Sequence, residues 1–174
     1  MRPKHLSLIC DMCVSVSLEC DGQIEESQSG GAIMTERQWP EHLDAVVEEF
    51  QGCFDAMERY ELLFEYAKKN PSPLSEDEWT DANQVQGCQS RAHIVCSIDQ
   101  NGHFQMRGGA DAQIVQGLIS ITAMAVNGMS STEVSNLSPK YVEAMGIRNS
   151  LTPSRANGFL NMFERIRSEA EKLG

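Results

Sequence analysis

The sequence lacks long apolar runs, basic runs and any regular spacing of cysteine among its 174 residues. A transmembrane helix needs about 18 or more mostly apolar residues in a row, and no such stretch is present. The sequence has 14 Lys and Arg residues and 25 Asp and Glu residues, so its formal net charge is −11. A chain this acidic repels phosphate backbones, which argues against a nucleic-acid partner. Either solubility or an electrostatic match to a basic protein partner explains the charge.

The six cysteines do not form the set expected of a disulfide framework. Three fall within the first twenty residues, and the other three are spread irregularly along the chain. Such a distribution favours a reducing compartment, so we expect a cytoplasmic location. The cysteines are Cys10, Cys13, Cys20, Cys53, Cys88 and Cys96.

The first 33 residues differ in composition from the rest of the chain. Asp11 interrupts their partly apolar run and no clear cleavage site follows, so they do not match a secretory signal. Residues 25–31 are polar and rich in Gly and Ser, as a linker would be. We predict that residues 1–33 are a disordered extension and that residues 34–174 form the folded domain.

The Cys10-x-x-Cys13 pair, with Cys20 beyond it, suggests a metal site as a weaker alternative for the extension. A structural zinc site takes four ligands, and His5 is the only histidine nearby. We therefore expect no metal site there.

Two amphipathic helices are predicted first, from about residue 40 to about residue 53 and over residues 56–70. The next stretch, "PSPLSEDEWTDAN" (71–83), holds two prolines and several acids, so we expect an extended surface loop. "AHIVCSI" (92–98) and "HFQMR" (103–107) alternate apolar and polar residues around Asn101-Gly102, which predicts a β-hairpin. A third strand before or after the hairpin stays open.

Within that hairpin, Cys96 lies in the apolar row, and we interpret it as a packed core thiol. His93 lies in the other row, and we interpret it as an outward or hydrogen-bonded strand residue rather than a partner of a thiol.

Several helices follow the hairpin, and their expected boundaries rest on capping residues. Asp111 is the expected N-cap of the central helix, and Gly128 is expected to end it. Ser138-Pro139 and Thr152-Pro153 each predict an N-cap followed by Pro in the first turn. Strands grouped together between helices indicate an α+β domain, with helices covering one face of a small antiparallel sheet.

The stretch "NQVQGCQSRAH" (83–93) places Cys88 among glycine, amide and hydroxyl neighbours, although free cysteine usually packs in a core. A nucleophilic cysteine needs a partly exposed thiol and a group that favours the thiolate. Gly87 allows a tight turn whose backbone N–H groups would stabilise a thiolate. From the residues alone, a reactive Cys88 and an ordinary loop thiol both stay open.

Three stretches together closely resemble the SufE family of sulfur-acceptor proteins, which includes the CsdE branch. They are "NQVQGCQSRAHIV", "GGADAQIVQGLI" and "LTPSRANGF", in this order and at this spacing. The likeness runs from about residue 43 to about residue 170 and includes "MERYELLFEYAKK". It implies an α+β fold that resembles the IscU-like scaffold proteins.

The resemblance also implies a function. Cys88 would take the terminal sulfur from the persulfide of a pyridoxal-phosphate-dependent cysteine desulfurase of the SufS or CsdA type. It would thereby activate the desulfurase and pass sulfur to a scaffold for iron–sulfur cluster assembly. The chain would be a sulfur-transfer accessory protein with a covalent persulfide intermediate, not an enzyme. It would need no cofactor or metal of its own and no nucleic-acid or membrane partner.

Six further residues match the family with less specificity. Arg155 supplies a positive charge that favours a thiolate or docks a partner, or is a surface arginine of a first helical turn. Asp111 is first a helix cap and second part of the wall around the cysteine loop. The residues expected to shape that loop are Gln86, Gly87, Gln89 and Ser90.

The sequence departs from the family at two places. Many relatives read "CQSQVW" where Arg91 and His93 occur here, and "GDSDA" where Gly109 and Ala110 occur. These changes bear on partner choice and loop packing more than on the cysteine chemistry.

The main alternative is an iron–sulfur cluster scaffold, which needs about three converging ligands. Only Cys53, Cys88 and Cys96 are available in the predicted domain, and their predicted elements do not bring them together. A plain interaction module with an incidental thiol is a second alternative. A stand-alone redox enzyme is a third, although the predicted domain has no CxxC pair.

Overall fold

The computed structural model describes residues 38–174. The predicted extension, residues 1–33, lies outside the described residues, together with Cys10, Cys13 and Cys20. The division at residues 33 and 34 therefore stays a prediction.

The two predicted N-terminal helices are present. The first consists of the short 3-10 turn η1 (Glu41–Leu43) and α1 (Asp44–Gln51), and α2 (Ala56–Lys68) follows. The Asp55 carboxylate caps α2 by accepting hydrogen bonds from the backbone N–H groups of Met57 and Glu58, at 2.8 and 3.0 Å.

The predicted hairpin is confirmed and is longer than its sequence pattern indicates. Strand β1 (Ala92–Ile98) pairs antiparallel with β2 (Phe104–Ala110). Asp99 closes the turn through its carboxylate, which accepts hydrogen bonds from the N–H groups of Asn101 and His103 at 2.8 and 2.9 Å. Strand β2 extends to Ala110. Residues 108–110, which were expected to lead into the central helix, therefore belong to the strand.

The question of a third strand is answered by the loop that precedes the hairpin. Single β-bridges join Pro73 to Gly108 on the free edge of β2, and Gln84 to His93 on the free edge of β1. Both edges are therefore covered by the same polar segment, which also contains the short turn η2 (Glu76–Glu78). In the described chain the sheet itself has two strands.

Five helices follow the hairpin, and the predicted Thr152 cap is confirmed. Thr152 accepts a hydrogen bond from Arg155 N at the start of the last helix, with Pro153 in the first turn. Ser130 and Glu133 form a reciprocal capping box. The helices are α3 (Gln113–Val126), α4 (Ser131–Asn136), α5 (Lys140–Ala144), α6 (Ile147–Ser150) and α7 (Pro153–Leu173).

Two predicted helix starts are wrong. Ala112, not Asp111, is the N-cap of α3, because Asp111 N still donates to Arg91 O at 3.1 Å and continues the strand pairing. The predicted end of α3 is confirmed, because the helix stops at Val126 with Asn127 as its C-cap, and Gly128 follows with a φ of 89°. The cap of α5 is Pro139 rather than Ser138, and the Pro139 carbonyl accepts from Val142 N at 3.1 Å.

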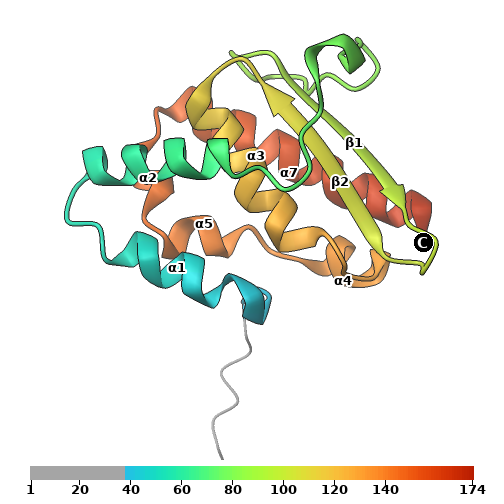
Figure 1. Ribbon diagram of the computed structural model, residues 1–174, viewed down its shortest axis with the longest axis horizontal. Coiled ribbons are helices and arrows are strands. Elements are labelled where there is room, and N and C mark those ends of the chain that lie inside the picture. Colours follow the sequence, from blue (N-terminus) through green and yellow to red (C-terminus); the bar gives the residue numbers. More distant parts are fainter. Residues whose placement is uncertain (1–37) are drawn as a thin grey trace, which may run out of the picture. The chain divides into compact units, whose positions relative to one another are not determined.

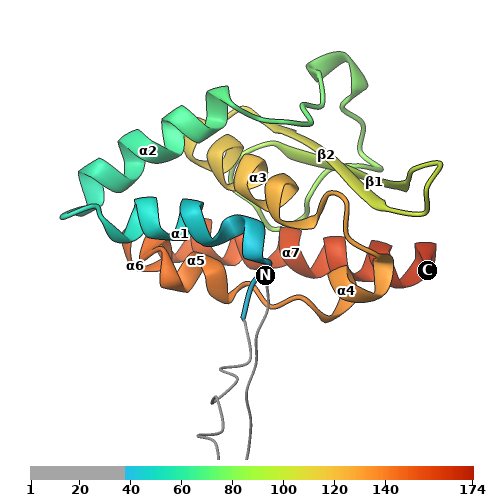
Figure 2. The same ribbon diagram turned by 60° about the horizontal axis from the view of Figure 1, so that its bottom comes forward.

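The fold class is α+β, as predicted. Helices α3 and α7 lie on the same side of the hairpin, and α2 packs along α3 (Figures 1 and 2). Their apolar faces and the inward strand residues form one core, which includes Phe50, Leu63, Ile94, Phe104, Ile119, Tyr141 and Phe163. None of the helices in residues 38–174 combines the length and apolar character needed to cross a bilayer.

Candidate functional site: the Cys88 loop

Cys88 lies on a tight loop that begins and ends on the edge of the sheet. Val85 N donates to Ala92 O at 2.7 Å, which closes the loop at its base. Inside it Gly87 has a φ of 77°, in the left-handed region that side chains other than glycine rarely adopt. The backbone therefore reverses just ahead of Cys88.

Two glycines let the loop approach helix α7 closely. A Cβ at Gly87 would lie 2.4 Å from Asn161 Nδ2, and a Cβ at Gly158 would lie 3.0 Å from Cys88 Sγ. Both positions are thus too close for a larger residue without movement of a neighbour. The sulfur lies directly over the glycine of the helix.

The Cys88 side chain is half-buried and lines a small pocket. The pocket encloses about 10 Å³, which is about the room that one water-sized group needs. Its walls come from the first strand, from α3 and from the first turns of α7. The other lining residues are Ala92, Val115, Leu118, Arg155, Gly158, Phe159 and Met162.

Arg155 is the one charged side chain that lines the Cys88 pocket in the described chain. The Thr152 cap and Pro153 fix the first turn of α7, and this turn places Arg155 beside Cys88. A guanidinium stays protonated at all accessible pH values, so it offers a permanent positive charge to a thiolate or persulfide. The structure places both residues on the walls of one pocket, and the role of Arg155 toward the thiol stays a prediction.

The other two described thiols are in different surroundings. Burial raises the pKa of the Cys96 thiol on β1 to about 12. Burial and the nearby Glu58 carboxylate raise the pKa of Cys53, which lies in the turn between α1 and α2. Neither environment favours the nucleophilic thiolate at neutral pH.

The predicted supporting residues occupy different places around the loop. Gln86 contributes its backbone carbonyl, which accepts from Asn161 Nδ2 at 3.3 Å. The side chains of Gln86 and Gln89 are exposed, and Ser90 is half-buried. Asp111 lies at the far end of the loop, where its carboxylate is 3.4 Å from Arg91 Nε. Its role as a wall residue is thus compatible with its position, whereas its role as a cap is not.

The two departures from the family pattern meet at one place. His93 and Gly109 are directly opposite each other in the hairpin, and the Trp79 ring stacks on His93 at 4.7 Å. A Cβ at Gly109 would lie 3.1 Å from Trp79 Nε1 and 2.5 Å from Leu74 O. Glycine at this position therefore leaves room for the loop that carries Trp79. The His93 ring has a hydrogen-bond partner in Asn83, whose Oδ1 lies 2.8 Å from Nδ1 of His93.

Three residues near the site were missed by the sequence argument, namely Trp79, Asn161 and Arg165. Trp79 covers His93 and lies 5.4 Å from the Arg91 guanidinium, in a cation–π contact. Asn161 binds the first half of the Cys88 loop at Gln86, and Arg165 binds the segment just before the loop at Gln84. The signal that could have found the last two is their helical spacing from Gly158 along one face of α7.

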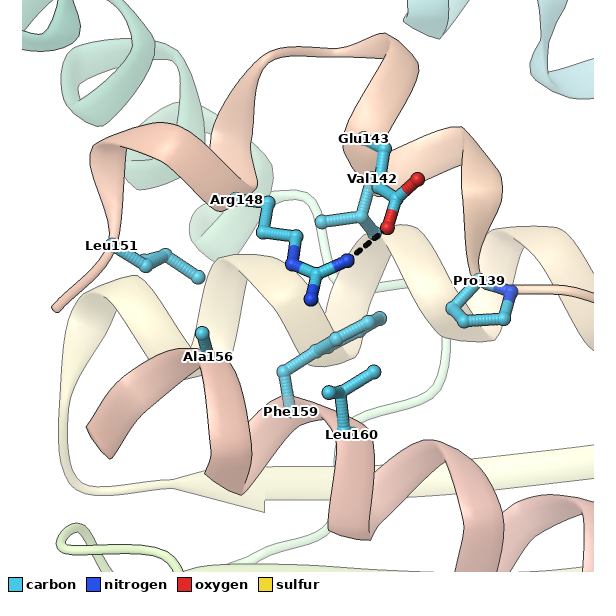
Figure 3. Close-up of a pocket in the computed structure, with 8 residues that line it drawn as sticks. All are labelled: Pro139, Val142, Glu143, Arg148, Leu151, Ala156, Phe159 and Leu160. Atoms are coloured by element: carbon cyan, nitrogen blue, oxygen red, sulfur yellow. Dashed lines mark hydrogen bonds and ion pairs between the residues drawn. The ribbon is translucent and has the colours of Figure 1, made fainter. Parts of the chain in front are cut away.

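A second small pocket of about 20 Å³ lies on the other side of Phe159. Figure 3 shows the Arg148 guanidinium pointing toward the Glu143 carboxylate, with Phe159 and Leu160 of α7 facing them. Phe159 also lines the Cys88 pocket, so it is a shared wall of the two. This second pocket contains no thiol.

Within residues 38–174 no group of three or more His, Cys, Asp or Glu side chains is placed to hold a metal ion. The three described cysteines lie in the α1–α2 turn, in the Cys88 loop and on β1. The chemistry available at the site is therefore that of one thiol and one guanidinium.

Comparison with known proteins identifies the family. The family model described as "SufE: Fe-S metabolism associated domain" matches residues 44–170. An uncharacterized SufE-like protein from Synechocystis sp. is 40% identical over 138 residues, which cover 79% of this chain and 86% of that protein. The chain belongs to the SufE family. The matched range contains Cys88, Asp111 and Arg155, and it agrees with the extent of the resemblance in the sequence.

Two further relatives of this SufE-family chain are more distant. SufE-like protein 1, chloroplastic/mitochondrial, from Arabidopsis thaliana is 28% identical over 145 residues, covering 83% of this chain and 39% of its own length. A solution structure of a hypothetical protein from Thermus thermophilus superposes with a TM-score of 0.64 at 22% identity. The superposition covers 78% of this chain and 97% of that protein. At this identity it is evidence for the fold and not for a function.

Proposed function

We propose that this SufE-family chain accepts sulfur on Cys88 from the persulfide of a pyridoxal-phosphate-dependent cysteine desulfurase. By removing that sulfur it activates the desulfurase, and it then passes the sulfur on for iron–sulfur cluster assembly. Family membership supports the coarser statement, a sulfur-transfer role in iron–sulfur metabolism. The observation that carries the finer proposal is the Cys88 thiol, which shares a pocket of about one atom's volume with Arg155.

The transfer is a thiol–persulfide exchange. The Cys88 thiolate attacks the terminal sulfur of the desulfurase persulfide, and a new S–S bond forms as the old one breaks. The desulfurase cysteine leaves as a thiolate, the Cys88 proton passes to solvent, and the terminal sulfur ends on Cys88. One S–S bond replaces another, so no external oxidant or reductant is needed. Arg155 would stabilise the negative charge on Cys88 before and after the step.

The pocket gives the persulfide a protected resting place. Its walls are mostly apolar, and its volume of about 10 Å³ is near the lower limit for one water, so a terminal sulfur would enter it as the loop widens slightly. A persulfide kept there would be shielded from small thiols in solution between the two partners. The carrier needs this property because it must leave the desulfurase before it meets the acceptor.

The proposal assigns the cofactor and the assembly step to other proteins. Pyridoxal phosphate belongs to the desulfurase, of the SufS or CsdA type, and the downstream acceptor is an iron–sulfur scaffold. We place the exchange in the cytoplasm, because the irregular cysteines must stay reduced for it.

The alternative of an IscU-like cluster scaffold has less support in this structure. A scaffold needs about three converging ligands, whereas the described cysteines lie on three separate elements. A sulfur carrier needs a single thiol that can be reached and protected in turn, which is what the Cys88 loop offers.

The function is tested by the rate at which a cysteine desulfurase releases alanine with and without this protein. We expect the wild-type chain to accelerate the reaction and the Cys88→Ser variant to lose that acceleration, because the serine hydroxyl cannot take sulfur. Cys53→Ser is the matched control, since it removes a different partly exposed thiol, and it should stimulate as the wild type does. Full stimulation by Cys88→Ser would overturn the proposal in favour of a plain interaction module.

A further inference from the structure

Two polar side chains of α7 bind the Cys88 loop although the sulfur chemistry does not use them. Asn161 Nδ2 donates to Gln86 O at 3.3 Å. Arg165 donates from Nη1 to Gln84 O and from Nη2 to Ala82 O, the latter at 2.6 Å. These contacts join residues about 80 positions apart, so they are formed only in the folded chain.

The contacts follow one face of the helix. Gly158, Asn161 and Arg165 are spaced three and four residues apart, so their side-chain positions lie in one row along α7. Gly158 lies against Cys88, and Asn161 binds the backbone carbonyl of Gln86. Arg165 binds the backbone carbonyl of Gln84, which is further back along the chain. The row therefore contacts both the segment that leads into the loop, from Ala82 to Gln84, and the first half of the loop up to the thiol.

Arg165 binds two backbone carbonyls that accept no hydrogen bond from strand β1. Asn83 O accepts from Ile94 N on β1, whereas Ala82 O and Gln84 O on either side of it accept from Arg165. Hydrogen bonds from a charged guanidinium are about twice as strong as those between neutral groups. Arg165 is thus the stronger of the two contacts and Asn161 the weaker.

Movement of this half of the loop would increase access to the sulfur. Cys88 is half-buried in a pocket lined by core residues, and Gly158 lies against its sulfur. A partner persulfide must reach bonding distance of that sulfur, and lifting of the loop from α7 would open its approach.

We propose that Asn161 and Arg165 are positioning residues that hold the Cys88 loop closed on α7 and so set how often the thiol is exposed. Their purpose in sulfur transfer rests on the proposed function, but the closure is a property of the folded chain alone. It can therefore be measured without a desulfurase.

The test is the rate of alkylation of Cys88 by iodoacetamide under native conditions, measured for the full chain by peptide mass spectrometry. Where opening is fast compared with alkylation, the rate reports the population of the open loop. Loss of the charged hydrogen bonds in Arg165→Ala should raise the Cys88 rate by about tenfold. Alkylation of Cys53, which is far along the chain in the α1–α2 turn, should stay within about twofold of the wild-type rate.

Arg167→Ala is the matched control, because Arg167 lies on the same helix but binds Ser135 O and Glu164 instead of the loop. It should leave the Cys88 rate unchanged. Arg165→Lys keeps a positive donor for one carbonyl and should give a rate between those of wild type and Arg165→Ala.

Asn161→Ala keeps the proposal testable if Arg165→Ala does not fold, since Asn161 is an exposed residue of a helix surface. It should raise the Cys88 rate by about fivefold, the effect of one neutral hydrogen bond. Wild-type Cys88 rates in Asn161→Ala and in every folded Arg165 variant would overturn the proposal. So would an equal rise at Cys53, which would indicate general destabilisation. Failure of the sulfur-transfer proposal is seen separately, as stimulation of a desulfurase by Cys88→Ser.

Discussion

At the scale of single residues, what surrounds each sulfur decides which thiol can react. Burial raises the pKa of Cys96 to about 12, while Cys88 shares its pocket with the permanent charge of Arg155. The glycine below Cys88 sets the depth of that pocket, because even a methyl group would contact the sulfur at 3.0 Å. Reactivity and protection at this site therefore depend on small residues as much as on charged ones.

Replacing Gly158 by alanine should push Cys88 out of its pocket. The new Cβ would lie 3.0 Å from Sγ and 3.3 Å from Cα of Cys88, so the loop must shift. We expect alkylation of Cys88 to accelerate by about fivefold, as overpacking of about 1 kcal/mol implies. The melting temperature should change little, because alanine is the better helix former.

Asn157→Ala is the control for the Gly158 variant, since it changes the adjacent exposed residue of the same helix. An unchanged Cys88 rate in Gly158→Ala, with the fold intact, would show that the pocket does not limit access.

At the scale of elements, the segment between α2 and β1 connects the sheet to the site. It covers both edges of the hairpin, carries Trp79 over His93 and ends in the Cys88 loop. Arg107 of β2 holds it through two hydrogen bonds to Glu78, at 2.8 and 2.7 Å, and a third to Pro73 O. The long polar stretch is thus a surface loop, as predicted, and it is attached to both edges of the hairpin.

Glu78 makes the attachment of this segment dependent on pH. Its hydrogen bond to Arg107, and then that from Ser75 N, hold the pKa of the carboxyl below the ordinary value of 4.5. A lowered pKa in the folded state means that the stabilisation is complete above about pH 5 and is lost as the pH falls further. The melting temperature of wild type should therefore exceed that of Glu78→Gln at neutral pH, by a margin that shrinks from pH 5 toward pH 3.

Thermal unfolding at pH 7, 5, 4 and 3 measures this margin. Glu61→Gln, on the exposed surface of α2, corrects for the loss of one negative charge. A margin between wild type and Glu78→Gln that stays constant over the whole range would contradict the assigned contact.

Local sequence signals predicted most elements, but not the contacts between them. The Asn101-Gly102 turn and the Thr152-Pro153 cap depend on a few adjacent residues, and both are confirmed. Asp111 has the chemistry of a cap, yet its backbone still pairs with Arg91, so strand pairing overrides the local preference. Arg165 binds a carbonyl 81 residues away, and no local pattern encodes such a contact.

The candidate site shows the same division. Cys88 was singled out by its polar neighbours and Arg155 by the family resemblance, and both line one pocket in the structure. The position of His93 under Trp79, opposite Gly109, required the register of the hairpin. Sequence departures that looked separate are therefore one packing change beside the loop.

At the scale of the whole molecule, the proposed function requires a strongly acidic chain to carry sulfur on Cys88 from one partner to another. Its net charge of −11 lets it associate with a basic surface through long-range attraction and leave it as salt rises. The half-buried Cys88 is protected between these encounters. Such an arrangement suits a carrier better than a scaffold that holds a cluster in place.

The central claim is tested most directly by mass spectrometry of the reduced chain after incubation with a cysteine desulfurase and cysteine. The account predicts a gain of one sulfur atom that is removed by a reductant and maps to the peptide containing Cys88. It also predicts that Cys88→Ser gains none, although five other cysteines remain. Sulfur found on another cysteine, or a full gain in Cys88→Ser, would contradict the assignment of Cys88 as the acceptor.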